Sequence, residues 1–168
     1  MSRVGVGYMG AYNSSKGLSP FERYKMGGSG MIGAYSFVGY QLLALRGYDD
    51  NSVSSSTGDP IATKYTLELR YPLSLNPSAT FYLLLFGEAG NTYPNFKKFN
   101  PLNVKRSAGI GLRIFLPMFG MLGVDYGWGF DTLDPHSDGY KGSSDSSIRQ
   151  KGYFGKFTFT IGMNLGEL

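Results

Sequence analysis

The stretch Ile61 to Pro72, IATKYTLELRYP, decides the fold, because apolar and polar residues alternate along it with a period of two. Positions 65, 67, 69 and 71 carry Tyr, Leu, Leu and Tyr, whereas positions 64, 66, 68 and 70 carry Lys, Thr, Glu and Arg. Successive side chains of a β-strand point to opposite faces of a sheet. The stretch therefore predicts a strand with one face suited to lipid and the other suited to water.

Five further stretches show the same alternation, so the sequence predicts six strands. Their expected bounds are Arg3–Tyr12, Ile61–Pro72, Thr80–Asn91, Val104–Pro117, Met121–Phe130 and Gly152–Leu165. The connectors between them are then about 48, 7, 12, 3 and 21 residues long. Alternation of long and short connectors is typical of an antiparallel outer-membrane β-barrel, whose inner turns are short and whose outer loops are longer. The first strand is expected to run outward and the last to run inward.

The composition fits this prediction but does not decide it. The chain has 168 residues, which suits one domain, and its hydrophobic fraction of 42% could also support a soluble core. It has 25 Gly, 13 Tyr and 12 Phe, and its charged fraction of 17% is below the roughly 25% of soluble domains. No apolar run approaches the roughly 20 residues of a membrane-spanning helix. If the chain spans a membrane, we expect it to do so with strands.

Several function classes are disfavoured by what the sequence contains. With 0 Cys, the chain offers no disulfide scaffold, thiol nucleophile or cysteine-ligated metal. The net charge of +4 is spread over the chain, with short doublets at Lys97-Lys98 and Lys105-Arg106. No basic stripe interleaved with aromatic residues is present, so we expect no nucleic-acid binding. We find no catalytic constellation and no metal site, and we predict a protein that is not an enzyme and needs no cofactor.

Three local motifs are better explained by structure than by chemistry. Gly5-Val6-Gly7-Tyr8-Met9-Gly10 matches the dinucleotide fingerprint G-x-G-x-x-G, but no preceding strand or following helix fits around it. We interpret these glycines as positions on the crowded inner face of a twisted strand. The single histidine, His136, lies in a turn-rich segment and is expected to be a solvated loop residue. The serine-rich run Ser52 to Thr57 is likewise expected to be a loop tip.

Six strands are too few for a closed barrel. The smallest bacterial barrels have about 8 strands, and an open edge in lipid leaves backbone groups unpaired at a cost of several kcal/mol each. The start of the sequence also lacks the apolar region of a signal peptide. Either a signal was removed or the chain is a piece of a longer protein, and the strand count favours the second interpretation.

One constellation of charged residues stands out. Arg46, in Leu45-Arg46-Gly47-Tyr48, lies in the long first connector, while Glu68 and Glu88 lie on the polar faces of the second and third strands. If the connector folds back into the barrel, one arginine can bridge both carboxylates through charge-assisted hydrogen bonds. The alternative is three independent solvated charges, and the pattern alone leaves both open.

The motifs together resemble the BamA and TamA type of outer-membrane assembly factor and its relatives in two-partner secretion. Leu45-Arg46-Gly47-Tyr48 is similar to the Val-Arg-Gly-Phe/Tyr motif of their long outer loop, and Phe86-Gly87-Glu88-Ala89-Gly90 is similar to a Phe-x-Asp/Glu-x-Gly strand. The matching segments follow the family order across nearly the whole chain. They are Ser19–Gly28, Leu45–Tyr48, Leu67–Pro72, Phe86–Gly90, Ser107–Leu112 and Phe157–Gly162.

The resemblance implies an architecture. Residues 1–168 would be the C-terminal part of a barrel domain, about the last six strands of a barrel of about sixteen strands. The connector of residues 13–60 would enter the lumen, where Glu68 and Glu88 would hold Arg46, Gly47 and Tyr48 as a loop-lumen clip. The missing part would be the earlier strands and the periplasmic POTRA domains, which receive substrate by β-augmentation.

The resemblance also implies a function at the bacterial outer membrane. Barrel proteins of this type template the folding and insertion of unfolded outer-membrane proteins at a lateral gate, together with membrane lipid and assembly-machinery lipoproteins. The last strand would form one side of that gate, where glycines are expected to weaken its pairing. The gate residues would be Gly152, Gly155, Phe157, Phe159, Ile161, Gly162 and Leu165. Leu165 departs from the aromatic residue with which family members usually end.

Of three alternatives, only the soluble one predicts a different environment for the apolar face. A passive porin-like barrel or a two-partner secretion translocator would share the barrel, whereas a soluble β-sandwich or lipocalin-like protein would bury that face in its core. For a membrane barrel we expect one continuous outward apolar band. The band residues would be Tyr65, Leu67, Leu69, Ile110, Leu112, Ile114, Val124, Tyr126 and Trp128.

Overall fold

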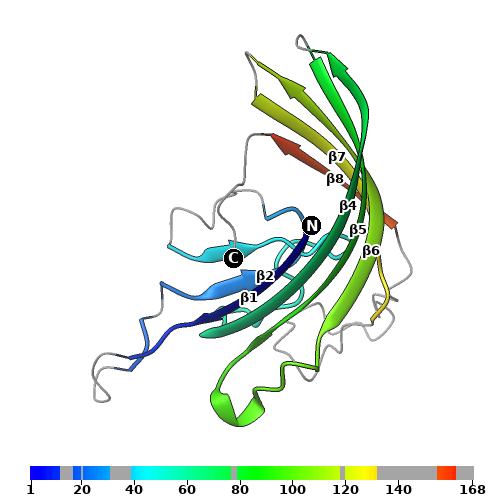
Figure 1. The fold of residues 1–168 in the computed structure, drawn as a ribbon. Coiled ribbons are helices and arrows are strands. Elements are labelled where there is room, and N and C mark those ends of the chain that lie inside the picture. The colour runs from blue at the N-terminus through cyan, green and yellow to red at the C-terminus, as the bar shows by residue number, and fades with distance from the viewer. Residues whose placement is uncertain are drawn as a thin grey trace, which may run out of the picture.

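The protein folds as one curved antiparallel sheet of six long strands, as the alternation predicts. The computed structural model describes residues 1–11, 17–19, 21–30, 39–76, 79–117, 120–131 and 155–161. Neighbouring strands pair in the order β1, β4, β5, β6, β7, β8, as Figure 1 shows. Their bounds are β1 Ser2–Tyr8, β4 Ile61–Asn76, β5 Ala79–Tyr93, β6 Lys105–Leu116, β7 Gly120–Gly129 and β8 Gly155–Ile161. The predicted all-β, antiparallel fold class is confirmed.

The predicted strand bounds need several corrections. β1 ends at Tyr8, short of the predicted Tyr12, which lies outside the described residues. β4 continues past Pro72 to Asn76, because a register shift between Pro72 and Ser74 absorbs the missing proline N–H before pairing resumes. β5 is longer at both ends than predicted. The predicted last strand, Gly152–Leu165, lies partly outside the described residues. Its described part forms β8, Gly155–Ile161.

The two faces of the sheet differ as the alternation predicts. The register sets Leu69 opposite Leu85, Leu85 opposite Ile110, and Ile110 opposite Tyr126, so these side chains share one face. None of the nine residues of the predicted apolar band is buried, and five of them are exposed. A β-sandwich would cover this face with a second sheet, and no such layer exists in the described part of the chain. The soluble sandwich alternative is therefore wrong.

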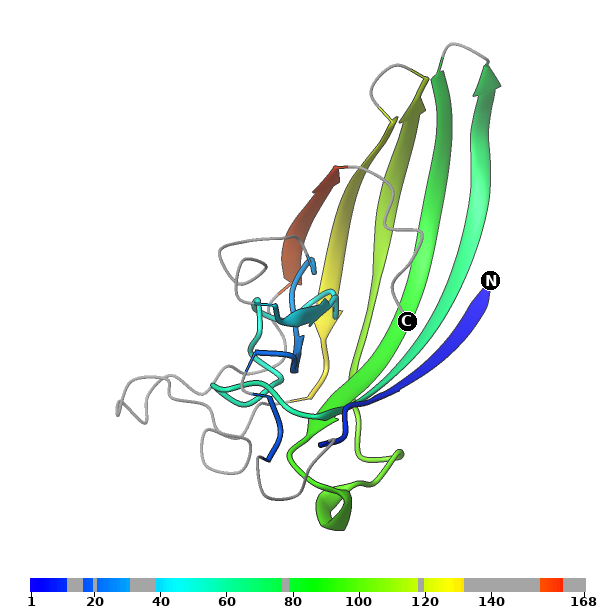
Figure 2. The same ribbon diagram turned by 90° about the vertical axis from the view of Figure 1, so that its left-hand side faces the viewer.

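The first connector packs against the concave side of the sheet (Figure 2). It contains two short strands that the sequence pattern did not predict, β2 at Tyr24–Met26 and β3 at Gln41–Leu43, which pair in parallel. β2 packs against β5. The connector thus carries structure of its own, and this structure lies on the face opposite the apolar band.

Each edge of the sheet has only one neighbour within the described residues: β1 pairs with β4, and β8 pairs with β7. The six strands therefore do not close into a barrel by themselves, in agreement with the strand-count argument. No helix in the described ranges is long and apolar enough to cross a membrane.

Candidate functional site

The Leu45-Arg46-Gly47-Tyr48 segment lies directly on the wall of β7. Gly47 has a φ of +92°, and a Cβ there would lie 2.8 Å from the carbonyl carbon of Trp128, so only glycine fits. The wall itself is also glycine: a Cβ on Gly127 or Gly129 would lie 2.9 Å from a backbone atom of Gly47. The backbone of the connector at Gly47 thus contacts the backbone of β7. This contact fixes the distance of the neighbouring Arg46 from the sheet.

The Arg46 guanidinium contacts three carboxylates. Its Nη2 donates to Glu88 Oε1 at 2.7 Å and to Glu68 Oε1 at 2.9 Å, and its Nη1 lies 3.4 Å from Asp125 Oδ2. Its backbone N–H donates to the second oxygen of Glu88 at 2.9 Å. The guanidinium carbon also lies 3.7 Å from the centroid of the Phe86 ring. The structure therefore brings together Arg46 and both carboxylates that the sequence singled out.

Further cations surround these carboxylates. Arg113 forms two hydrogen bonds of 2.7 Å with Asp125, Arg70 donates to Glu68 at 2.7 Å, and Lys64 lies 4.0 Å from Glu88. Counting Arg46, four cations surround three carboxylates, and we call these seven residues the Arg46 cluster.

The surrounding carboxylates keep Arg46 protonated. Only 8% of its side chain is exposed, and this burial by itself disfavours the charged form. Glu88, and then Asp125 and Glu68, outweigh that cost and raise the pKa of Arg46 above its ordinary value. Arg46 therefore keeps its charge, and the strength of its ion pairs depends on the three carboxylates.

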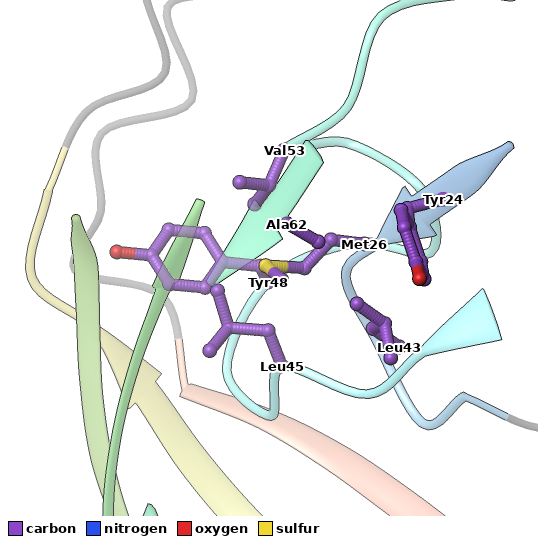
Figure 3. Packing of buried hydrophobic residues seen from close by; sticks show 7 residues of the cluster. All are labelled: Tyr24, Met26, Leu43, Leu45, Tyr48, Val53 and Ala62. Atoms are coloured by element: carbon purple, nitrogen blue, oxygen red, sulfur yellow. The ribbon is translucent and has the colours of Figure 1, made fainter. Parts of the chain in front are cut away.

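An apolar cluster lies next to the Arg46 cluster, since Leu45 belongs to it, and Figure 3 shows its side chains. Met26 and Leu45 are completely buried in it, and Met26 sits over Gly90 of β5, where a Cβ would lie 2.8 Å from its sulfur. Most of its members come from the connector, and Ala62 comes from β4. The members are Tyr24, Met26, Leu43, Leu45, Tyr48, Val53 and Ala62.

Tyr48 joins the apolar cluster to the sheet. Figure 3 shows its ring among the apolar residues and its hydroxyl pointing away from them. The hydroxyl donates to the carbonyl of Arg106 at 2.8 Å and accepts from the N–H of Asp131 at 3.1 Å. Burial raises the pKa of the Tyr48 phenol to about 12, so it stays a neutral donor.

Sequence reasoning missed Asp125 and the glycine wall. Asp125 is fully buried between Arg46 and Arg113. A signal for it was present, since it is the only charged residue in the predicted strand Met121–Phe130 and alternates with Val124 and Tyr126 of the band. The glycine wall had no such signal, because the sequence does not show which backbone approaches it.

The predicted gate residues are only partly described. Phe157, Phe159 and Ile161 point to the band face of β8 and are exposed, whereas Gly152, Gly162 and Leu165 lie outside the described residues. At Gly155 the expected gap in side-chain packing is filled, because the ring of Tyr126 lies where a Cβ would be. Aromatic cover of this kind supports an edge glycine, so at Gly155 the expected weakening is offset.

On the concave side β8 contacts the connector directly. Lys156 forms an ion pair with Asp49, one residue beyond Tyr48. A polar cavity of about 330 Å³ lies beside this pair and is lined in part by Asp50 and Thr158. The connector therefore touches the predicted gate strand as well as the wall of β7.

The prediction that the serine-rich run Ser52 to Thr57 is a loop tip is wrong, because Val53 is 2% exposed within the apolar cluster and Ser54 is 5% exposed. A Cβ on Gly7 would lie 2.5 Å from the Tyr24 ring, which confirms the crowded inner-face interpretation at that position. Within the ranges described, no group of three or more His, Cys, Asp or Glu side chains is arranged to hold a metal ion. His136 lies outside those ranges.

Comparison with known proteins bears on the resemblance that the motifs suggested. Residues 1–164 match the family model described as the Omp85 superfamily domain, which covers the BamA and TamA type. A search of individually curated proteins gave no match. Members of this superfamily are bacterial outer-membrane barrels that insert or translocate proteins and are not enzymes. With 164 of its 168 residues matched, the chain belongs to the Omp85 superfamily.

Proposed function

We propose that these six strands are part of the barrel of an outer-membrane assembly factor that inserts other β-barrel proteins, in the manner of BamA. The first connector would occupy the lumen. There Glu68, Glu88 and Asp125 would hold Arg46, while Gly47 lies against Gly127 and Gly129 and Tyr48 bonds to the backbone of Arg106 and Asp131. The function requires no catalytic residue, since it depends on strand pairing.

The observation that carries this proposal is the close packing of the first connector against the concave side of the sheet (Figure 2). A passive porin conducts solutes through a polar, water-filled lumen. Here the connector covers the wall with two clusters, and Gly47 approaches Gly127 and Gly129 to backbone contact. A segment packed this closely against the strands would obstruct the lumen of a porin. It is compatible with a barrel that acts on substrate at the edge of its sheet.

The free edge of β8 supplies the working surface of the proposed gate. β8 has a neighbour on one side only within the described residues, and its opposite side presents backbone N–H and C=O groups. In a membrane these groups are satisfied only by another strand. An incoming substrate strand can pair there, as in β-augmentation. POTRA domains, lipoproteins and unfolded barrel substrates are the partners that this mechanism calls for.

Site-specific photocross-linking in the full protein tests the proposal. A photoreactive amino acid replaces Phe157 or Phe159 on β8, and a control replaces Leu85, which faces the same side from β5 in the middle of the sheet. A strand paired with β8 brings its side chains within about 5 Å of the β8 positions but not of Leu85. We expect a folding substrate to cross-link at Phe157 and Phe159 only.

Two outcomes contradict the proposal. One is the absence of substrate adducts at β8 while the protein is assembling substrate, and the other is equal labelling at Leu85. The fate of the substrate separates insertion from translocation. Inserted substrate stays in the membrane as a folded barrel, whereas substrate of a secretion translocator crosses the membrane and is recovered free on its far side.

A further inference from the structure

The connector between β5 and β6, residues 94–104, folds back over the band face of the sheet. By alternation Ile61 and Thr63 point to that face, since Ala62 between them belongs to the apolar cluster on the concave side. Yet Ile61 is 2% exposed and Thr63 is 0% exposed. They are covered from outside, so this connector does not extend straight out from the end of the sheet.

Hydrogen bonds and ring contacts fix the connector in this position. The Tyr93 hydroxyl donates to the carbonyl of Asn100 at 2.6 Å, and the Tyr65 hydroxyl donates to that of Pro101 at 3.2 Å. The rings of Tyr8 on β1 and Phe96 in the connector lie 4.7 Å apart. Within the connector, the short 3-10 helix η2, Phe96–Lys98, is capped by Asn95, whose side chain accepts from the N–H of Lys98. The segment is therefore tied to three strands and is locally structured.

This packing leaves an unusual combination of side chains on the surface. Leu102 is 86% exposed and Phe96 is 62% exposed, and both belong to the connector that Tyr65 of the apolar band binds. Lys97 and Lys98 are exposed between them in sequence and form no ion pair with another described residue. Arg106 nearby differs, because two of its three guanidinium nitrogens already donate to Asp131.

We propose that residues 94–104 form an anchor for lipids of the outer leaflet whose phosphate groups give them a net negative charge. Phe96 and Leu102 enter the boundary of the acyl chains. Lys97 and Lys98 bind the phosphate groups of the lipid headgroups. Aromatic residues favour the membrane interface, and basic side chains reach from apolar surroundings to the headgroups. The inference rests on the membrane placement of the family and not on the activity proposed above.

Spin labelling of the full protein, in a cysteine-free background and reconstituted in vesicles, tests the anchor. The label is attached at Leu102→Cys, with one reference at Leu69→Cys in the apolar band and another at Phe21→Cys in the first connector, both exposed. Collision with oxygen reports lipid surroundings, and collision with a nickel complex reports water. We expect the label at position 102 to favour oxygen, as at position 69, and the label at position 21 to favour nickel. Equal nickel access at positions 102 and 21 overturns the proposal.

The phosphate contacts are tested by charge. Vesicles of phosphatidylcholine are compared with vesicles that also contain anionic phosphatidylglycerol, which should lower the nickel access of the label at position 102. Each basic side chain near an anionic surface strengthens attraction by about fivefold, so Lys97→Glu with Lys98→Glu should abolish this difference. High salt should weaken it. Free inorganic phosphate at constant ionic strength should leave it unchanged if the lipid headgroup is the ligand. Insensitivity to lipid charge, or competition by free phosphate, overturns this part of the proposal.

Discussion

Leu45 and Arg46 are adjacent in the chain, yet they enter two different clusters, and the clusters hold the connector in different ways. The apolar cluster buries Met26 and Leu45 completely and gains its stability from non-directional burial of apolar surface. The Arg46 cluster buries charges, each of which costs several kcal/mol to desolvate unless its partners are in place. We therefore expect the apolar cluster to tolerate small shifts of the connector and the Arg46 cluster to be disrupted by them.

The two clusters therefore contribute different properties. Apolar packing alone would let the connector slide along the wall, because many positions bury similar area. The Arg46 cluster, with hydrogen bonds of 2.7 and 2.9 Å to Glu88 and Glu68, is satisfied at one position only. We infer that the apolar cluster supplies affinity for the sheet. The Arg46 cluster fixes the single position at which the connector docks, a property that we call registry. The variants below are chosen to separate these two properties.

Replacing Arg46 with alanine should have the largest effect. The change leaves Glu68, Glu88 and Asp125 buried with less compensation, at a cost of about 3–5 kcal/mol in connector opening. Hydrogen exchange of connector amides in the full protein measures this opening, and assembly activity should fall with it. Arg70→Ala is the matched control. It removes another partner of Glu68, but its side chain is 52% exposed and the expected cost is below about 1 kcal/mol.

Charge reversal separates registry from simple packing. Arg46→Glu should abolish the docking of the connector, and Glu68→Arg or Glu88→Arg introduced in the same protein should restore part of it. Normal activity in Arg46→Ala, or no rescue by either reversal, would show that the cluster does not fix the connector.

Met26→Ala should come next, because it opens a cavity between the connector and Gly90. Large-to-small changes at fully buried sites cost about 2–5 kcal/mol, and we expect about 3 kcal/mol in the same hydrogen-exchange measurement. Met26→Leu keeps the volume and should cost less than about 1.5 kcal/mol. Because the apolar cluster is expected to tolerate small changes of shape, assembly activity should fall gradually as the free energy of connector opening decreases. An abrupt loss with Met26→Leu would contradict the assigned role.

Gly127→Ala tests the wall without replacing a residue of either cluster. The added Cβ would lie 2.9 Å from the Gly47 nitrogen and 3.2 Å from the Arg46 carbonyl carbon, so the connector must shift. Overpacking of this kind costs about 1–3 kcal/mol, and Arg46 should lose part of its contact with Asp125. Gly87→Ala on β5 is the control, since nothing lies within 4 Å of its Cβ position. Equal protection of the connector in both variants would refute the close seat at Gly127.

The sequence predicted the sheet well because alternation reports a local property, the face to which each side chain points. The alternation placed Glu68 and Glu88 on the polar face of adjacent strands, but it left their pairing with Arg46 open, and the family resemblance was what implied that pairing. β2 and β3 could not be predicted, since each is three residues long and exists only through contact with the other and with the sheet. The extension of β4 beyond Pro72 depends on a register shift that its partner strand determines.

The effect at Gly155 also could not be predicted from the chain alone. A glycine in a strand suggests weak pairing, but its consequence depends on the diagonal neighbour across the ladder. Here that neighbour is Tyr126, whose ring also lies 4.6 Å from the Phe157 ring. Composition shows the glycine, and only the register shows the tyrosine.

Tyr48 gives the smallest and most discriminating test, because its ring belongs to the apolar cluster and its hydroxyl bonds to the sheet. Tyr48→Phe removes only the bonds to the Arg106 carbonyl and the Asp131 N–H, and should cost about 1 kcal/mol in connector opening. Tyr48→Leu removes the ring as well and should cost more. If the hydroxyl contributes registry, Tyr48→Phe combined with Arg46→Ala should cost less than the sum of the two single changes, because both release the same constraint. Strict additivity would mean that the hydroxyl only adds affinity, and registry would then belong to the Arg46 cluster alone.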